Sequence, residues 1–74
     1  MPMEATRGRE YQRFLKRLRA ARLEAGLTQI QAAKRLRTSQ AFVSKSESGD
    51  RRVDVVELKR FARLYDKPTD YFLS

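Results

Sequence analysis

The sequence lacks cysteine, histidine and tryptophan altogether, and it holds only three glycines and two prolines. Without cysteine there is neither a disulfide framework nor a thiolate metal site. Without histidine the chain loses the commonest general base and the commonest neutral metal ligand. No pair of carboxylates stands out as an acid–base couple either. These absences argue against an enzyme, against a metal site and against a bound cofactor.

Long apolar runs are missing as well. None approaches the roughly 18 residues that a bilayer-spanning helix needs, and the first residues lack the apolar core of a signal peptide. We therefore expect a cytoplasmic protein with no membrane partner. The 74 residues suffice for one small domain. A domain of this size buries only about 60% of its unfolded surface, so we expect its stability to be modest.

Acidic residues are scarce beside basic ones, 9 against 17, which gives a net charge of +8. All of the excess lies in residues 1–52, which carry 13 basic and 5 acidic side chains, whereas residues 53–74 carry 4 of each. This asymmetry indicates an anionic partner, either nucleic acid or a membrane surface. A surface charge that only keeps the protein soluble is the alternative.

Residues 1–9 show no hydrophobic period, so we predict a flexible basic arm there and a folded domain at residues 10–74. From Glu10 onward the pattern is helical. One stripe of a 3.6-residue period carries Tyr11, Phe14, Leu15, Leu18 and Arg22. The stripe is short, which favours packing inside the protein over binding to a membrane. Because Arg22 lies on this apolar face, its guanidinium needs a partner. Gly26 suits the left-handed cap that ends the helix.

A second helix is predicted to begin at Thr28 and to end near Leu36. Thr28 and Gln31 form a T-x-x-Q capping box, in which each side chain satisfies a backbone donor of the first turn. Arg37 and Thr38 follow as a tight turn.

A third helix is predicted from Gln40 to about Ser46. Ser39 is a good N-cap for it, and Gly49 suits the left-handed residue beyond its end. The helix is too short and too polar to be stable by itself, and Val43 is its main apolar anchor. Its other face displays Gln40, Ala41, Ser44 and Lys45.

A fourth helix is predicted after Asp54, which forms a D-x-x-E capping box with Glu57. Its inner face is expected to carry Val55, Leu58, Phe61, Ala62 and Tyr65. Pro68 prevents a simple continuation of this helix, and residues 69–73 fit one further helical turn. No stretch alternates as a strand would, so the predicted fold class is all-α.

Two short helices joined by a tight turn, the second able to enter a groove, are typical of a helix-turn-helix. From about Leu15 to Phe72 the chain resembles the Cro/cI (XRE) family of DNA-binding proteins. The resemblance rests on R-x-x-x-G-L-T-Q from Arg22, S-Q-A-F-V-S-K from Ser39, E-S-G-D-R-R from Glu47 and the D-V-V-E-L helix that follows. It implies a compact, five-helix, lambda-repressor-like domain with the helix-turn-helix at helices 2 and 3. It also implies a sequence-specific transcriptional regulator that reads the major groove of double-stranded DNA with helix 39–46.

The resemblance assigns roles to individual residues. Base reading falls to Gln40, Ala41 and Lys45, with Ser44 beside them. Glutamine can bond adenine N6 and N7 together, lysine can donate to guanine, and the alanine methyl suits thymine. Phosphate contacts fall to Gln29, Thr38, Ser39, Ser48, Arg51 and Arg52, because helix N-termini and basic loops attract the backbone. Arg22 and Glu47 are implied as a structural ion pair. For each surface residue, a side chain that simply faces solvent is the alternative.

Three positions depart from the family pattern. Arg37 stands where glycine is usual, and a non-glycine residue in the left-handed region costs roughly 1 kcal/mol. Ala32 and Ser46 stand where large aliphatic residues are usual, so the core beside the recognition helix is short of volume. We expect one of Phe42, Phe61 or Ile30 to fill the space, or the recognition helix to shift.

Family relatives commonly bind palindromic operators as homodimers, and we expect the same of this chain. A stand-alone repressor, a restriction–modification controller and the antitoxin of a toxin pair all fit its size, so a toxin or an antagonist is a further candidate partner. Two other hypotheses are a protein-interaction module that uses the basic face differently and a binder of RNA or of membrane surfaces.

Overall fold

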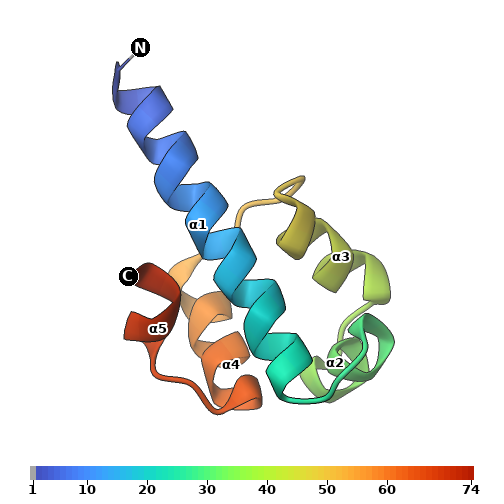
Figure 1. Ribbon diagram of the computed structural model, residues 1–74. Helices are drawn as coiled ribbons and strands as arrows, with labels where there is room; N and C mark the ends of the chain where they lie inside the picture. Colours follow the sequence, from blue (N-terminus) through green and yellow to red (C-terminus); the bar gives the residue numbers. More distant parts are fainter. Residues whose placement is uncertain (1) are drawn as a thin grey trace.

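The computed structural model describes the backbone of residues 2–74 and the side chains from Gly8 onward. Five helices make up its regular structure: α1 (Pro2–Glu24), α2 (Gln29–Leu36), α3 (Gln40–Ser48), α4 (Val55–Tyr65) and α5 (Thr69–Leu73). Over residues 2–74 no strand occurs. Figure 1 shows the long α1 crossing the molecule, with α3 and α5 on opposite sides of it. The prediction of an all-α domain of five helices, with the helix-turn-helix at α2 and α3, is confirmed.

Side-chain caps set the helix boundaries at the predicted residues. The Thr28 hydroxyl accepts from the Gln31 amide at 3.1 Å, and the Gln31 side-chain oxygen accepts from the Thr28 amide at 2.9 Å. Asp54 and Glu57 form the same reciprocal pair at 2.8 and 3.1 Å. These bonds satisfy amides that have no partner within their helix.

The end of α3 differs slightly from the prediction, because the helix reaches Ser48 rather than Ser46. Gly49 then takes the left-handed conformation, with φ at 90°. A Cβ at this glycine would also lie 3.0 Å from the Leu15 Cδ1 atom. Glycine is therefore required here both by backbone conformation and by the close approach of α1.

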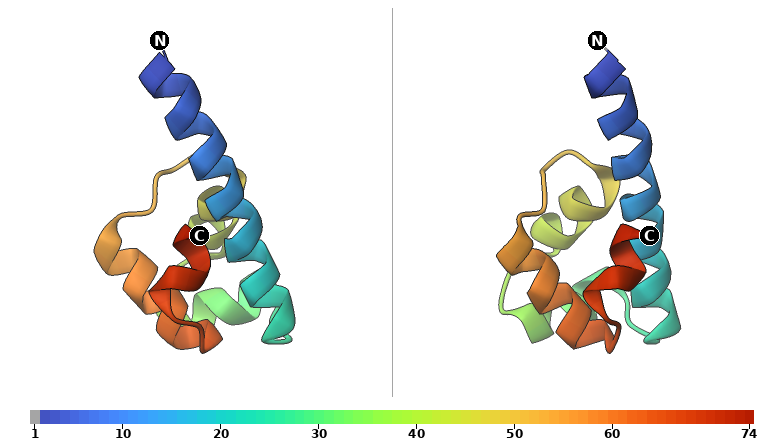
Figure 2. Two further views of the ribbon diagram at one scale, coloured as in Figure 1. Left: turned by 60° about the vertical axis from the view of Figure 1, so that its left-hand side comes forward. Right: turned by 90° about the vertical axis from the view of Figure 1, so that its left-hand side faces the viewer.

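The start of α1 differs more. The sequence predicts a flexible basic arm at residues 1–9 and no regular structure there, whereas in the structure the helix begins at Pro2. Proline suits the first position of a helix, and the alanine, glutamate and arginine that follow favour helix formation. The hydrophobic period is missing because this part of α1 projects past the other helices (Figure 2). Met1 and the side chains of residues 1–7 lie outside the described part.

The core lies between α1 and the other four helices. Its members come from every helix: Phe14, Leu15, Leu18, Ala21, Ala32, Ala33, Leu36, Val43, Leu58, Phe61, Ala62, Tyr65 and Phe72. The prediction for Val55 is wrong, since this side chain is 79% exposed. It stands in the first turn of α4 beside a groove, where α4 is not yet covered by another helix. Among the described helices, none is long and apolar enough to cross a membrane.

Candidate nucleic-acid interface

The turn between α2 and α3 keeps the left-handed conformation although glycine is absent from it. Arg37 has φ 59° and ψ 48°. Its amide donates to the Lys34 carbonyl at 3.2 Å, and the Thr38 amide donates to the Ala33 carbonyl at 2.9 Å. These bonds satisfy the last carbonyls of α2. The backbone therefore accepts the strain of a non-glycine residue rather than adopting a different turn.

Arg22 finds its partner in Glu47, as the resemblance implies. The Arg22 Nε lies 2.6 Å from the Glu47 Oε2, and the Arg22 Nη2 donates to the Glu47 Oε1 at 3.1 Å. A third donor, Nη1, reaches the Leu27 carbonyl at 2.9 Å. The hydrogen bond with Glu47 raises the pKa of Arg22 above its ordinary value, against the opposing effect of burial. The pair joins α1 to the last turn of α3.

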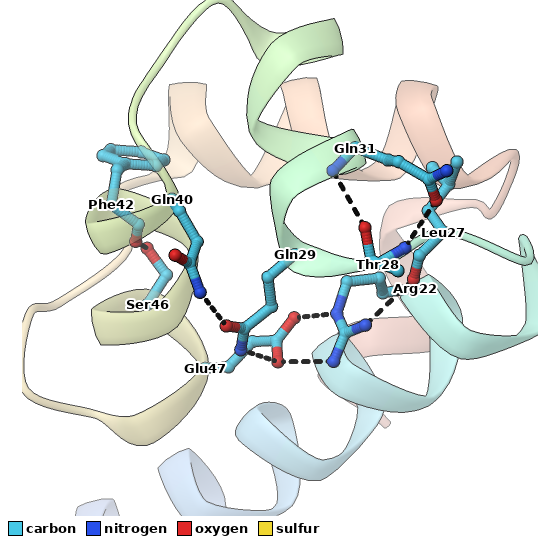
Figure 3. A network of polar contacts seen from close by, with 9 residues as sticks. All are labelled: Arg22, Leu27, Thr28, Gln29, Gln31, Gln40, Phe42, Ser46 and Glu47. Carbon is cyan, nitrogen blue, oxygen red and sulfur yellow. Dashed lines mark hydrogen bonds and ion pairs between the residues drawn. The ribbon is translucent and has the colours of Figure 1, made fainter.

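Hydrogen bonds continue from this pair to the start of α3 (Figure 3). The Gln29 Nε2 donates to the Glu47 Oε1 at 3.1 Å, and the Gln40 Nε2 donates to the Gln29 Oε1 at 3.2 Å. We call Arg22, Glu47, Gln29 and Gln40 the polar relay. The relay fixes which end of each glutamine side-chain amide faces its neighbour, because the amide oxygen accepts and the amide nitrogen donates. One N–H of Gln40 is thereby committed to Gln29, while its oxygen and its second N–H remain for a ligand.

Arg51 packs beside Phe42 and Ser46 of α3. Its guanidinium lies 4.3 Å from the centre of the Phe42 ring. It also donates to the Ser46 hydroxyl at 3.3 Å and to both carboxylate oxygens of Glu57 at 2.9 Å. The ion pair raises the pKa of Arg51 and lowers that of Glu57. The guanidinium is therefore tied to Glu57, although 32% of the Arg51 side-chain surface stays exposed.

Two aromatic side chains, Phe42 and Phe61, pack beside Arg51, Ser46 and Glu57, and we call these five residues the junction. Phe42 is half-buried and stacks on Phe61, with 6.1 Å between the ring centres. Ser46 is fully buried and donates to the Phe42 carbonyl at 2.7 Å. Phe42 leans against Phe61 beside the buried Ser46, which is one of the packings predicted, whereas Ile30 stays 54% exposed. The contribution of Arg51 was not foreseen, although its charge and that of Glu57 lie only six positions apart.

A protein-family model described as Helix-turn-helix matches residues 18–72, which include every residue of the relay and of the junction. The chain belongs to this XRE-type helix-turn-helix family. Membership makes it a DNA-binding transcription regulator in general terms. A search of curated proteins and a search of solved structures gave no match.

The remaining predicted contacts of this helix-turn-helix protein fall into two groups. On α3, Gln40, Ala41 and Lys45 are exposed and Ser44 is half-buried. Outside this exposed face, several hydroxyls already have backbone hydrogen-bond partners. Ser39 accepts from the Phe42 amide at 3.1 Å, and Ser48 donates to the Lys45 carbonyl and accepts from the Asp50 amide, both at 3.3 Å. The exposed Arg52 stacks its guanidinium 4.6 Å from the Tyr11 ring centre, and Thr38 is half-buried in the turn.

Proposed function

We propose that the protein is a sequence-specific transcriptional regulator that reads the major groove of double-stranded DNA with α3. The polar relay is the observation that carries the proposal. It holds an exposed glutamine, Gln40, in a defined orientation at the N-terminus of the helix. A side chain held in this way is suited to reading a base, because the ordering cost is met before DNA arrives.

The reading face follows from what each side chain offers. Gln40 keeps one acceptor and one donor, the pair that adenine N6 and N7 require. Lys45 can donate to guanine O6 or N7, and the Ala41 methyl suits a thymine methyl. Ser44 lies beside them with a hydroxyl that donates or accepts.

Phosphate contacts surround this face in the proposed complex. Gln29 keeps a second amide N–H beside the N-terminus of α2, and Thr38 and Ser39 lie at the N-terminus of α3, where backbone amides attract phosphate. Ser48, the last residue of α3, and the exposed Arg52 in the loop after it extend the contacts. Arg51 is left out of this set, since its guanidinium is bound to Glu57.

Two copies on one operator complete the proposal. A two-fold dimer places its recognition helices about one turn, roughly 34 Å, apart, so the operator is palindromic. A repressor, a controller of restriction–modification genes and an antitoxin all act in this way. In the proposal a separate protein, a toxin or an antagonist, binds this complex and regulates it.

Selection of binding sites from random duplex DNA tests the proposal directly. We expect an enriched palindrome whose complex survives a rise in salt that removes binding to random DNA. Replacing Gln40 by alanine should cost about 1–3 kcal/mol at one operator position and little on random DNA. If no sequence is enriched, the basic face serves another partner and base reading is wrong.

A further inference from the structure

Tyr11 of α1 contacts the loop after α3 at two places. Its hydroxyl accepts a hydrogen bond from the Val53 amide at 2.9 Å, and the Cζ atom of Arg52 lies 4.6 Å from the centre of its ring. Figure 1 shows this loop passing beside α1 on its way from α3 to α4. One side chain of α1 therefore holds both the backbone and a charged side chain of the loop.

The ring of Tyr11 is itself supported by the core. Tyr11 is half-buried, and its ring centre lies 5.3 Å from that of the buried Phe14. Phe14 in turn packs edge-on against Phe72 of α5, with 6.5 Å between the ring centres. Aromatic rings at these separations attract one another. Tyr11 is therefore a fixed support for the loop rather than a loose surface side chain.

The loop is held on both sides of Arg52. Arg51 donates to the two carboxylate oxygens of Glu57 at 2.9 Å, and Val53 is bound to Tyr11. Arg52, between these two fixed residues, is exposed. Its neighbours determine where its backbone lies, and the Tyr11 ring limits where its guanidinium can go.

Stacking on Tyr11 leaves the Arg52 guanidinium able to bind a phosphate. A guanidinium contacts an aromatic ring through its flat face, whereas its five N–H donors lie in its own plane. Two of these donors suit two phosphate oxygens. An arginine that is already held in place also loses less conformational freedom when it binds. The contact with the ring and a contact with DNA can therefore exist together.

We propose that Tyr11 is a positioning residue, which holds Arg52 where it meets the DNA backbone. The proposal rests on the proposed function, in which Arg52 binds a phosphate. Tyr11 precedes residues 18–72, the part of the chain that the family model matches. Membership of the family therefore does not assign this role, and the first half of α1 contributes to DNA binding through the loop.

A double-mutant cycle tests the proposal, with affinity for a random duplex measured at several salt concentrations. Tyr11→Leu removes the ring and the hydroxyl and should weaken binding about three- to tenfold, because Arg52 must then be ordered when DNA binds. Tyr11→Phe keeps the ring and should lose only about twofold. In an Arg52→Ala background neither change should weaken binding further, because the side chain that Tyr11 positions is gone.

Tyr71→Leu is the matched control. Tyr71 is also half-buried, and the guanidinium of Arg17 lies 5.2 Å from its ring centre. It belongs to α5, however, on the other side of α1 from α3 (Figure 1). Tyr71→Leu should therefore leave the affinity and its salt dependence unchanged. Circular dichroism melts identify a temperature at which every variant is folded, and Tyr11→Phe completes the cycle if Tyr11→Leu does not fold.

Three results overturn the proposal. One is a loss from the Tyr11 substitutions that is equally large with and without Arg52, and another is an equal loss from Tyr71→Leu. The third is an Arg52→Ala variant that binds more weakly while the Tyr11 variants bind normally, which removes the positioning role and keeps the phosphate contact. If Arg52→Ala itself changes nothing, the phosphate contact in the proposed function fails together with its positioning, and site selection alone then judges base reading.

Discussion

Glu47 joins the interior of the protein to the proposed reading face, because its carboxylate accepts from both Arg22 and Gln29. The two charged side chains are almost fully buried, at 8% and 6% exposed. A buried pair of this kind adds little over apolar residues of equal volume, but removing one partner leaves a buried charge without its counterion. A change at Glu47 should therefore act on stability and on the proposed base reading at once.

We expect Glu47→Gln to lower the free energy of unfolding by about 3 kcal/mol, because Arg22 stays charged and loses its counterion. Urea denaturation measures the change. Glu24→Gln is the matched control, because the Glu24–Lys67 ion pair lies at the surface and its loss should leave the midpoint nearly unchanged. In site selection Glu47→Gln should also accept more bases at the position assigned to Gln40, since Gln29 is then free to turn. Equal effects of the two substitutions would contradict this view of Glu47.

Tyr65 should make the protein sensitive to alkali. Burial, with a smaller contribution from the Glu47 charge, raises the pKa of its hydroxyl far above the value of about 10 that an unfolded tyrosine has. Since the unfolded chain ionises first, this contribution to stability is complete below about pH 10 and is lost as the pH rises further.

We expect Tyr65→Phe to flatten the alkaline fall in melting temperature between about pH 9 and 12. Thermal melts followed by circular dichroism measure it. Tyr71→Phe, which removes the hydroxyl of a half-buried tyrosine of α5, is the comparison. The explanation fails if the profile of Tyr65→Phe is also unchanged.

At the scale of the elements, α3 is held at its two ends by polar side chains rather than by a large apolar face. Its first residue is bound to α2 through Gln29, and its last turns are bound through Glu47 and by the loop that carries Arg51. Small residues at positions 32 and 46 leave room for this arrangement, and both are fully buried. The angle of α3 therefore depends on the loop after it as well as on the helices beneath it.

Two neighbouring arginines of that loop should behave differently. Arg51→Ala should lower the free energy of unfolding by about 1–2 kcal/mol, since it loses the Phe42 contact and the paired bonds to Glu57. Arg52→Ala should change stability less and should weaken binding to all DNA sequences alike, with the salt slope reduced by about 1. Denaturation and salt titrations of each variant distinguish them. Reversed effects would place Arg51 on the DNA and Arg52 in the fold.

The turn between α2 and α3 offers a test of stored strain. Arg37→Gly should raise the free energy of unfolding by about 0.5 kcal/mol. Glycine relieves the steric strain at φ 59°, but it also gives the unfolded chain more conformational freedom, which offsets part of that gain. Asp66→Gly is the comparison, because Asp66 also has a left-handed backbone, with φ 57°. Aspartate tolerates this conformation better than arginine does, so its replacement should gain less. A larger gain at Asp66 would show that Arg37 is not strained.

For the whole molecule, local chemistry explains which parts of the fold could be predicted. The capping boxes at Thr28 and Asp54 and the left-handed glycine at position 49 depend on neighbours three or four residues away, and the structure has them at the predicted places. The start of α1 could not be predicted by the same means, because hydrophobic periodicity reports packing and residues 2–9 project beyond the other helices.

The candidate site was partly predictable for a similar reason. The partner of Arg22 followed from family resemblance, and the exposed face of α3 followed from helical spacing. The position of Arg51 depends on contacts with both α3 and α4, and the Gln29–Gln40 bond depends on the angle between two helices. Such contacts join elements that are brought together only by the complete fold, so no single stretch of sequence reveals them.

The polar relay also limits how this protein can be redesigned. Ala41 and Lys45, two residues of the proposed reading face, are exposed and lie outside the relay, so their side chains can be varied without repair elsewhere. A change at Gln40 also releases the Gln29 amide oxygen that it now bonds, so it alters the orientation of two side chains at once. A library that aims at new operators should therefore couple positions 29 and 40 as one unit and keep Glu47 constant.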